Sequence, residues 1–393
     1  QVARVAGYHR QLGSTEKPKE PILIQEVGPD GRRIPIYEVV PTAVDEDKTS
    51  GLRKTEAQWI VMKAMAAAEH LKIEKLHSPW PPPLPEQVYL EDLFQRLQTS
   101  VWDGKEWPER QDWAGVPVAL LDEPIRQQQR PLLINTLDDG NVVLVGAPGS
   151  GRTTFLLTLS SSLMLSMSPD WVHLHLIDFG GHQLEAACSE FPHVAGVYEA
   201  SEIERIRRLL STLNVELEER RRNFSDVGAV SLSGYRRANL DAPPMPLILT
   251  MINNFSGFYE VFRDEIIAWN RLLREGGSYG LYFVLTSDRI PTGRIADLIQ
   301  TRIALRLTDR TWYSLILGSR PDLTTHDTHP GRGFINTKPP TELQIVQPRE
   351  GTPEEQIAEL QDLGKSMSRS WEGEHPMPVR ILGEHVSLED VLP

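Results

Sequence analysis

The chain has 393 residues, of which 40% are hydrophobic and 24% are charged, a composition typical of soluble globular domains. Acidic residues outnumber basic ones by 54 to 41, and the net charge of −13 argues against broad contact with a nucleic-acid backbone. No apolar run approaches the roughly 18 residues that a membrane-spanning helix needs. The single cysteine, Cys188, excludes an internal disulfide and a thiolate metal cluster. Because the chain begins with Gln1 and has no signal-peptide pattern, we expect it to be part of a longer protein.

The N-terminal part of the chain is predicted to be a connector rather than an independent core. Residues 22–27 and 34–40 flank a Gly-Pro-Asp-Gly turn, which predicts a β-hairpin. Residues 52–71 have the apolar periodicity of an amphipathic helix. The proline-rich residues 78–86 then predict a stiff, extended boundary.

A weak internal repeat suggests how the domains are arranged. Residues 84–94 (LPEQVYLEDLF) and 382–392 (LGEHVSLEDVL) share Leu, Glu, Val, Leu, Glu and Asp at an offset of 382 − 84 = 298. A vaguer match between two helix-like segments has nearly the same offset, which suggests tandem domains of about 300 residues. We therefore expect a connector in residues 1–77, one complete domain in residues 78–350, and a helix with the start of a linker in residues 351–393.

Short apolar strands alternate with helical segments through the central part of the chain. The predicted strands are residues 142–145, 171–177, 247–252, 281–286 and 303–307, and the predicted helices are residues 153–167, 202–222 and 258–275. This alternation predicts an α/β fold with a mostly parallel central sheet covered by helices on both faces. Ligands of such sheets bind at the carboxyl ends of the strands.

The strand at Val142–Val145 leads into a glycine-rich loop and a helix, the pattern of a phosphate-binding P-loop. The candidate nucleotide-binding residues are Gly146, Ala147, Pro148, Gly149, Ser150, Gly151, Arg152, Thr153 and Thr154. Glycines let the loop direct backbone N–H groups at phosphate oxygens, and Thr153 stands where a hydroxyl would hold Mg²⁺. Arg152 replaces the usual lysine, and we expect phosphate binding to survive this change better than phosphoryl transfer. The alternative is an ordinary glycine-rich turn between a strand and a helix.

A hydrolytic P-loop domain also needs acids at the end of a second apolar strand, to position Mg²⁺ and to activate water. The matching strand ends in Asn253 and Asn254, which we include among the candidate nucleotide-binding residues. Because a neutral amide cannot take a proton from water, the sequence predicts the loss of general-base catalysis, and we assign no catalytic residue. The alternative is that another strand is the relevant one. Asp178 follows such a strand, but we expect it to pack or cap near the loop.

Two further features are predicted to be structural. The run of charged residues 218–222 is typical of a solvated helix end, although an interface role remains the alternative. His173 and His175 share one face of a strand, which favours a core or groove position over a metal site.

Together, these motifs resemble the FtsK/SpoIIIE-like ATPases, and within them the EccC/EssC-type motor ATPases of type VII secretion. The resemblance covers roughly residues 78–350. Besides the P-loop, it lies in residues 177–184 (IDFGGHQL), 191–197 (FPHVAGV), 219–224 (ERRRNF), 279–289 (YGLYFVLTSDR) and 302–310 (RIALRLTDR).

The resemblance implies a RecA-like P-loop NTPase fold that binds ATP and Mg²⁺, in the cytoplasmic part of a membrane-anchored bacterial motor protein. The implied partners are adjacent ATPase domains of the same chain, other secretion-complex subunits in a homo-hexamer, and small helical-hairpin secreted substrates. Nucleic acid is not an expected partner, and the isolated fragment can be monomeric.

This chain departs from active members of the family at Arg152, at Asn253 and Asn254, and at Gly277, where active members place a trans-acting arginine. The departures predict a degenerate middle domain that binds nucleotide and acts as a regulatory module. Two alternatives stay open: a working ATPase with substitute residues, and a DNA translocase domain.

Overall fold

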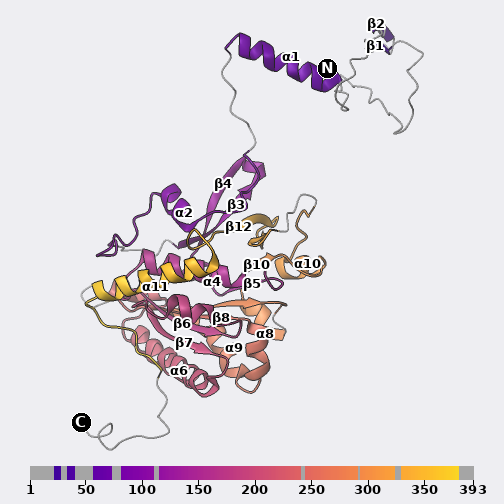
Figure 1. Ribbon diagram of the computed structural model, residues 1–393. Helices are drawn as coiled ribbons and strands as arrows, with labels where there is room; N and C mark the ends of the chain where they lie inside the picture. Colours follow the sequence, from indigo (N-terminus) through magenta and orange to yellow (C-terminus); the bar gives the residue numbers. More distant parts are fainter. Residues whose placement is uncertain are drawn as a thin grey trace, which may run out of the picture. The chain divides into compact units, whose positions relative to one another are not determined.

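The computed structural model divides into two units, Gln1–His77 and Ser78–Pro393, and each is described by itself (Figure 1). It describes the backbone of residues 22–27 and 33–39, and it describes residues 56–72, 81–109, 115–239, 244–290, 293–323 and 329–379. No helix in these ranges is both long enough and apolar enough to cross a bilayer. The second copy of the predicted repeat, residues 382–392, lies outside the described residues.

The first unit contains the predicted hairpin and the predicted helix. Strands β1 (Ile22–Val27) and β2 (Arg33–Val39) pair antiparallel. Helix α1 (Glu56–His70) follows, and none of its residues is buried. Its apolar side chains, including Trp59 and Met65, are therefore exposed within this unit.

The second unit is built on one sheet with the strand order β4-β3-β12-β11-β10-β5-β9-β8-β6-β7 (Figure 1). Its strands are β3 (Val116–Glu123), β4 (Gln128–Ile134), β5 (Val142–Val145), β6 (Val172–Asp178), β7 (Val194–Glu199), β8 (Leu247–Asn253), β9 (Leu281–Ser287), β10 (Thr301–Leu305), β11 (Arg332–Ile335) and β12 (Thr341–Ile345). The segment from β10 to β7 is parallel throughout, which confirms the predicted parallel sheet, although β7 itself was not predicted as a strand. Beyond β10 the sheet continues through four antiparallel strands that the sequence did not predict.

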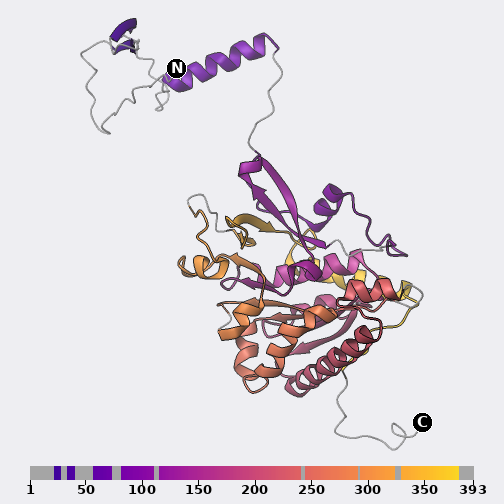
Figure 2. The same cartoon turned by 180° about the vertical axis from the view of Figure 1, so that it is seen from behind.

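Helices cover both faces of this sheet. The helical elements are α2 (Leu90–Leu97), η1 (Pro124–Arg126), α3 (Thr136–Asp139), α4 (Arg152–Ser166), α5 (Gln183–Cys188), α6 (Ile203–Asp226), α7 (Leu232–Ala238), α8 (Phe255–Val261), α9 (Ile266–Glu275), η2 (Gly276–Tyr279), η3 (Gly293–Leu298), α10 (Trp312–Leu317) and α11 (Pro353–Ser370). In both views, α4 and α11 lie on one side of the sheet, and α6 and α9 lie on the other (Figure 1, Figure 2). The buried side chains form two clusters accordingly, one with α4, α5 and α11 and one with α6, α8 and α9.

Alternation along β5 explains why the sheet needs both layers. Val142 and Leu144 belong to the cluster under α4, whereas Val143 and Val145 belong to the cluster under α6. Because successive side chains of a strand point to opposite faces, an all-apolar strand has to be covered twice. The phosphate-loop strand is therefore a central strand, fixed between β10 and β9.

The prediction of one continuous helix over residues 258–275 is wrong. The chain forms α8 and then, after a turn around Phe262, the separate helix α9. Phe258 and Phe262 pack against each other, with ring centroids 4.7 Å apart, and Trp269 packs on Phe258 at 5.1 Å. These three rings can be buried in one cluster only if the chain turns between the two helices. Their burial outweighs the local preference for one continuous helix.

The charged run in α6 is not simply a solvated helix end. Arg220 is 1% exposed; it donates to Glu216 at 2.6 Å and to the carbonyl of Tyr279 at 3.0 Å. Its neighbour Arg221 pairs with Glu275 of α9 at 2.8 Å. The run therefore attaches α6 to α9 and η2, because a buried guanidinium is tolerated only where its donors are bonded.

Candidate functional site

The glycine-rich loop lies at the carboxyl end of β5 and is held on three sides by backbone hydrogen bonds. Gly146 N–H donates to Ser287 at the end of β9, and Ala147 N–H donates to Arg306 after β10. The carbonyl of Ser150 accepts from Gly331 N–H at 2.7 Å. The loop is thus preorganised by its neighbours in the sheet.

At two positions of the loop, the structure leaves no room for any side chain larger than that of glycine. Gly151, which precedes α4, has φ = +109°, and a Cβ there would lie 3.1 Å from the Gly331 nitrogen. A Cβ on Gly146 would collide with Ser150 Oγ. The first turn of α4, which contains Thr153 and Thr154, leaves N–H groups without intrahelical acceptors. The loop therefore has the closed curvature and the free donors of an anion-binding cradle.

Two buried polar atoms of the loop lack a partner among the described residues: Ser150 Oγ and Arg152 Nη1. A buried, unbonded polar atom destabilises a protein by roughly 1–3 kcal/mol, and native proteins keep few of them. Both atoms are donors, so an oxyanion such as a phosphate would satisfy them. Because these two donors need acceptors, the residues of the loop fit the phosphate group of a nucleotide.

The charges around the loop have both signs. Burial lowers the pKa of Arg152, and the nearby carboxylate of Asp288 opposes that effect. Asp288 follows β9; its carboxylate accepts from Ser256 Oγ at 2.5 Å and pairs with Arg289 at 3.6 Å. On the other side of the loop, Arg306 donates to the carbonyl of Pro148 at 3.3 Å. The loop thus has two guanidinium groups and one partly exposed carboxylate beside it.

The two asparagines lie at the same edge of the sheet, with β9 between them and the loop strand. Asn253 is 3% exposed; its amide donates to Asp178 Oδ1 at 2.9 Å and its carbonyl accepts from Thr286 Oγ1 at 2.9 Å. Asp178 also accepts from Gly180 N–H at 2.8 Å. Both ends of the Asn253 side chain are therefore engaged within the protein, in a buried network across β6, β8 and β9.

Asn254 takes the left-handed conformation, φ = +61°, at the start of α8. Its backbone N–H donates to Thr286 Oγ1 at 3.2 Å and its side-chain amide donates to the carbonyl of Phe179 at 3.0 Å. An aspartate in its place would face that carbonyl with no donor. Asn254 therefore orients the loop between β6 and α5, which lies within the family-like residues 177–184.

Three residues of this site were not among the sequence-based candidates. Asp178 was expected to pack or cap near the P-loop. It caps Gly180 and bonds to Asn253, but β8 and β9 lie between its strand and the loop strand, and its place beside Asn253 was not foreseen. Asp288 and Arg306 lie within residues 279–289 and 302–310, which carry the family resemblance, but the sequence analysis assigned neither of them a role. The signal that would have found them is that each directly follows a strand parallel to β5.

The histidines on β6 are structural, as predicted. His175 is 6% exposed and its Nδ1 lies 3.1 Å from the Tyr198 hydroxyl. Burial lowers the pKa of His175 to about 3, so its ring is neutral near neutral pH.

Comparisons with known proteins agree with this geometry. The sequence profile of the FtsK/SpoIIIE family matches residues 99–315. The type VII secretion system protein EssC of Staphylococcus aureus (strain Mu50) is 28% identical over 355 residues, which cover 88% of this chain and 23% of that protein. The ESX secretion system protein EccC of Geobacillus thermodenitrificans is 26% identical over 353 residues, covering 88% of this chain and 22% of that protein. The chain therefore spans less than a quarter of the length of these relatives.

Solved structures of EccC are similar in fold. ATPases 2 and 3 of Thermomonospora curvata EccC, solved in complex with a signal sequence peptide, give a TM-score of 0.67 at 25% identity over 80% of this chain and 58% of that chain. The cytoplasmic domain of the same ATPase gives 0.67 at 26% identity, over 78% of this chain and 37% of that chain. These neighbours confirm the P-loop ATPase fold with a mostly parallel sheet. The profile match spans more than half of the sequence and includes both the phosphate-binding loop and the asparagine pair, so this chain belongs to the FtsK/SpoIIIE family.

Proposed function

We propose that this domain binds ATP with Mg²⁺ through its P-loop, hydrolyses it poorly or not at all, and acts as a binding and regulatory module of a type VII secretion motor. The observation that carries the proposal is the pair of buried, unpartnered donors, Ser150 Oγ and Arg152 Nη1, inside a glycine cradle. Phosphate oxygens would give both donors the acceptors that they lack within the protein.

The roles that we assign to the loop follow from its geometry. Backbone N–H groups of the first turn of α4 and the Ser150 hydroxyl would donate to phosphate oxygens. Arg152 would supply the positive charge, and the Thr153 hydroxyl would be the protein's ligand to Mg²⁺. The bound ion would neutralise part of the phosphate charge. Arg306 can add a second cation, because its guanidinium already lies against the loop.

Poor hydrolysis follows from the state of the asparagine pair. Near neutral pH an amide cannot act as a general base, and the Asn253 amide is bonded at both ends. Asp178 cannot replace it freely, since its carboxylate is 4% exposed and accepts hydrogen bonds from Gly180 and Asn253.

A second candidate function, a working ATPase, rests on Asp288. This carboxylate is near the loop, its side chain is 43% exposed, and it is a possible base. An Asp288→Asn variant separates the two functions. If Asp288 is the base, the wild type hydrolyses ATP and the variant does not. If Asp288 serves only to offset Arg152, both chains hydrolyse ATP at background, and the variant keeps or strengthens nucleotide binding.

The assembly that we propose follows from the similarity to EssC and EccC. The T. curvata structure shows that ATPases 2 and 3 of that protein bind a signal sequence peptide. By analogy, we propose that this domain works beside adjacent ATPase domains of its own chain, in a homo-hexameric complex that exports small helical-hairpin proteins. In this proposal residues 1–77 are the connector, residues 78–350 are the ATPase domain, and residues 351–393 lead to the next domain. The motor would be anchored in the membrane and would keep this domain in the cytoplasm.

The experiment is a thermal-unfolding titration with Mg-ATP and Mg-ADP, combined with a steady-state phosphate-release assay. A ligand that binds only the folded state raises the melting temperature by mass action. We expect a saturable rise in the wild type, little or no rise for Arg152→Ala, and background phosphate release from both. An unchanged rise in Arg152→Ala would show that this arginine is not a phosphate ligand. Turnover by the wild type would favour the second function.

A further inference from the structure

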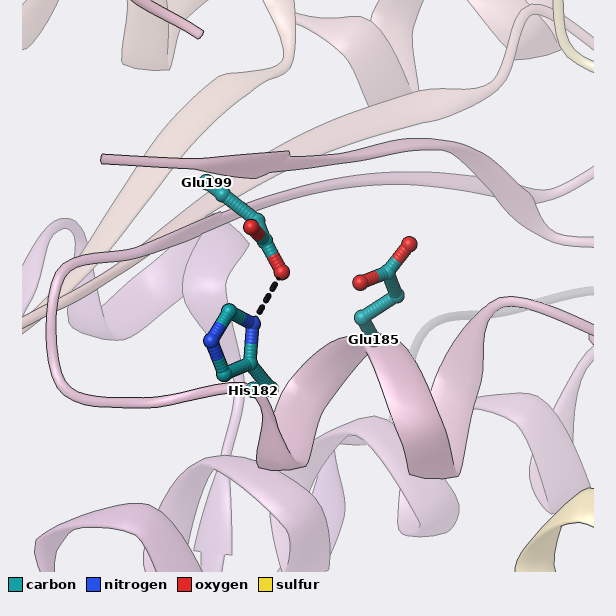
Figure 3. Close-up of side chains that lie close together, drawn as sticks. All are labelled: His182, Glu185 and Glu199. Carbon is teal, nitrogen blue, oxygen red and sulfur yellow. Dashed lines mark hydrogen bonds and ion pairs between the residues drawn. The ribbon is translucent and has the colours of Figure 1, made fainter. Parts of the chain in front are cut away.

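Three metal-ligating side chains converge on the surface beside the carboxyl ends of β6 and β7. They are His182, Glu185 and Glu199, and one ligand atom from each lies within 4.8 Å of the other two. Figure 3 shows Glu199 descending from β7 onto the His182 ring, with the Glu185 carboxylate beside them on the first turn of α5 (Figure 3). Small side-chain rotations would bring all three atoms to the roughly 2.0–2.2 Å that nitrogen and oxygen ligands keep from a zinc ion.

The backbone under these side chains is well fixed. Glu199 pairs in the sheet with Asp178, the last residue of β6. From the other end of the loop, Leu184 is fully buried and its N–H points at the Asp178 carboxylate, 3.4 Å away. His182 begins α5, since its carbonyl accepts from Ala186 N–H at 3.1 Å. A strand end and a helix start therefore hold the three ligands on two rigid elements, as a binding site requires.

The charges of the cluster are not balanced by its own members. The ring Nδ1 of His182 hydrogen-bonds to Glu199 Oε1, and this bond raises the pKa of His182. The Glu185 carboxylate lies beside this pair, so two carboxylates and one imidazole face the same small volume (Figure 3). A basic side chain in the same region, Arg205, is engaged by Glu202 at 2.8 Å. With two carboxylates and one histidine converging, the cluster offers a divalent cation both charge compensation and three ligand atoms.

We propose that His182, Glu185 and Glu199 form a surface binding site for a divalent transition-metal ion of the zinc type. One imidazole nitrogen and two carboxylate oxygens are a ligand set for Zn²⁺ or Co²⁺, whereas Mg²⁺ and Ca²⁺ prefer oxygen ligands alone. The His182 side chain is 81% exposed, so water would complete the coordination. Such an ion would join the start of α5 to the end of β7.

The site would influence the candidate phosphate-binding edge through one residue. The loop between Asp178 and Leu184 has Asp178 at its start, and the same carboxylate bonds to Asn253. An ion that fixes the end of this loop would therefore also restrict the Asp178–Asn253 network. This inference does not depend on nucleotide binding, and each can fail without the other.

The test is isothermal titration of the EDTA-stripped chain with zinc sulfate, repeated with cobalt sulfate so that visible absorption reports nitrogen coordination. We expect a single saturable site, a zinc-dependent rise in melting temperature, and weaker binding by about tenfold or more in His182→Ala and in Glu185→Gln. Both side chains are exposed, and circular dichroism would verify that the variants fold.

The matched control is another exposed histidine–glutamate pair, which lies outside the proposed cluster. His329 Nε2 lies 3.1 Å from Glu86 Oε1, and Glu86→Gln is expected to leave zinc affinity unchanged. The proposal is overturned if the wild type shows no saturable zinc binding. It is equally overturned if His182→Ala binds zinc as tightly as the wild type, or if Glu86→Gln weakens binding as much as Glu185→Gln does.

Discussion

Replacing Asn253 by aspartate tests whether this domain has lost catalysis through one reversible substitution. On sequence grounds, Asn253→Asp restores an acid at the end of β8. In the structure, however, the new carboxylate would lie about where the amide nitrogen now sits, 2.9 Å from Asp178 Oδ1. Both residues are almost completely buried, at 3% and 4% exposure. We therefore expect the variant to be destabilised and to remain without hydrolytic activity.

The loss of stability in Asn253→Asp can be estimated from two cases: both carboxylates charged, or one of them protonated. Two like charges ~4 Å apart at an effective dielectric constant of ~20 repel by about 4 kcal/mol. The pair can avoid this by binding one proton, which for a carboxyl of ordinary pKa also costs about 4 kcal/mol at pH 7 and about 1–2 kcal/mol at pH 5. The free energy of unfolding should therefore fall by about 4 kcal/mol at pH 7 and by clearly less at pH 5.

The assay is urea unfolding of the wild type, Asn253→Asp and Asn253→Ala at both pH values. Asn253→Ala removes the same donor without adding a charge, so its loss of stability should not depend on pH in this range. Added Mg²⁺ should recover part of the stability of Asn253→Asp if the ion can bridge the two carboxylates. An aspartate variant as stable as the wild type at pH 7, or one with a loss equal at both pH values, would refute the reasoning.

Three further predictions follow from the same contacts. Asp288→Asn should tighten Mg-ATP binding by about 1.4- to fivefold, because removing a partly exposed like charge is worth about 0.2–1 kcal/mol. Calorimetry would check this, with Mg-ADP less affected. Gly151→Ala should destabilise the domain by about 1–3 kcal/mol, because φ = +109° is strained for alanine, and should abolish the nucleotide-dependent rise in melting temperature. Burial holds the folded-state pKa of His175 at about 3, below the unfolded value of about 6.5. The unfolded chain therefore binds the proton first, and stability present above pH 6.5 is lost as the pH falls. Between pH 7 and pH 5 this residue should remove about 2 kcal/mol, and His175→Gln should lose less than the wild type over the same interval.

Local patterns were sufficient to predict every strand of the parallel half of the sheet except β7. β5 is apolar throughout and β8 and β9 are mostly apolar, whereas β6 alternates histidines with apolar residues; the helix after the P-loop starts within one residue of its predicted position. The antiparallel extension escaped prediction because its strands are recognisable only by their partners. In β3 and β12, for example, pairing joins residues more than two hundred positions apart.

The candidate site divides in the same way. The cradle residues from Gly146 to Thr154 follow from sequence alone, because glycine spacing is a local property. The network around Asn253 does not, since the sequence gives no reason to place Asp178 against it. Parallel pairing of β6 with β8 sets Asp178 directly opposite Asn253, and that register determines the hydrogen bond. Only the fold shows that the amide is a structural donor.

The most direct measurement of the central claim is the chemical identity of the nucleotide that the domain retains. The chain would be incubated with Mg-ATP at neutral pH, freed of unbound nucleotide by rapid gel filtration, denatured, and analysed by ion-exchange chromatography over several hours, with Arg152→Ala as the non-binding control. Our account predicts that the wild type retains intact ATP throughout and that the control retains none. Recovery of ADP and phosphate from the wild type, at a rate above spontaneous hydrolysis, would contradict it.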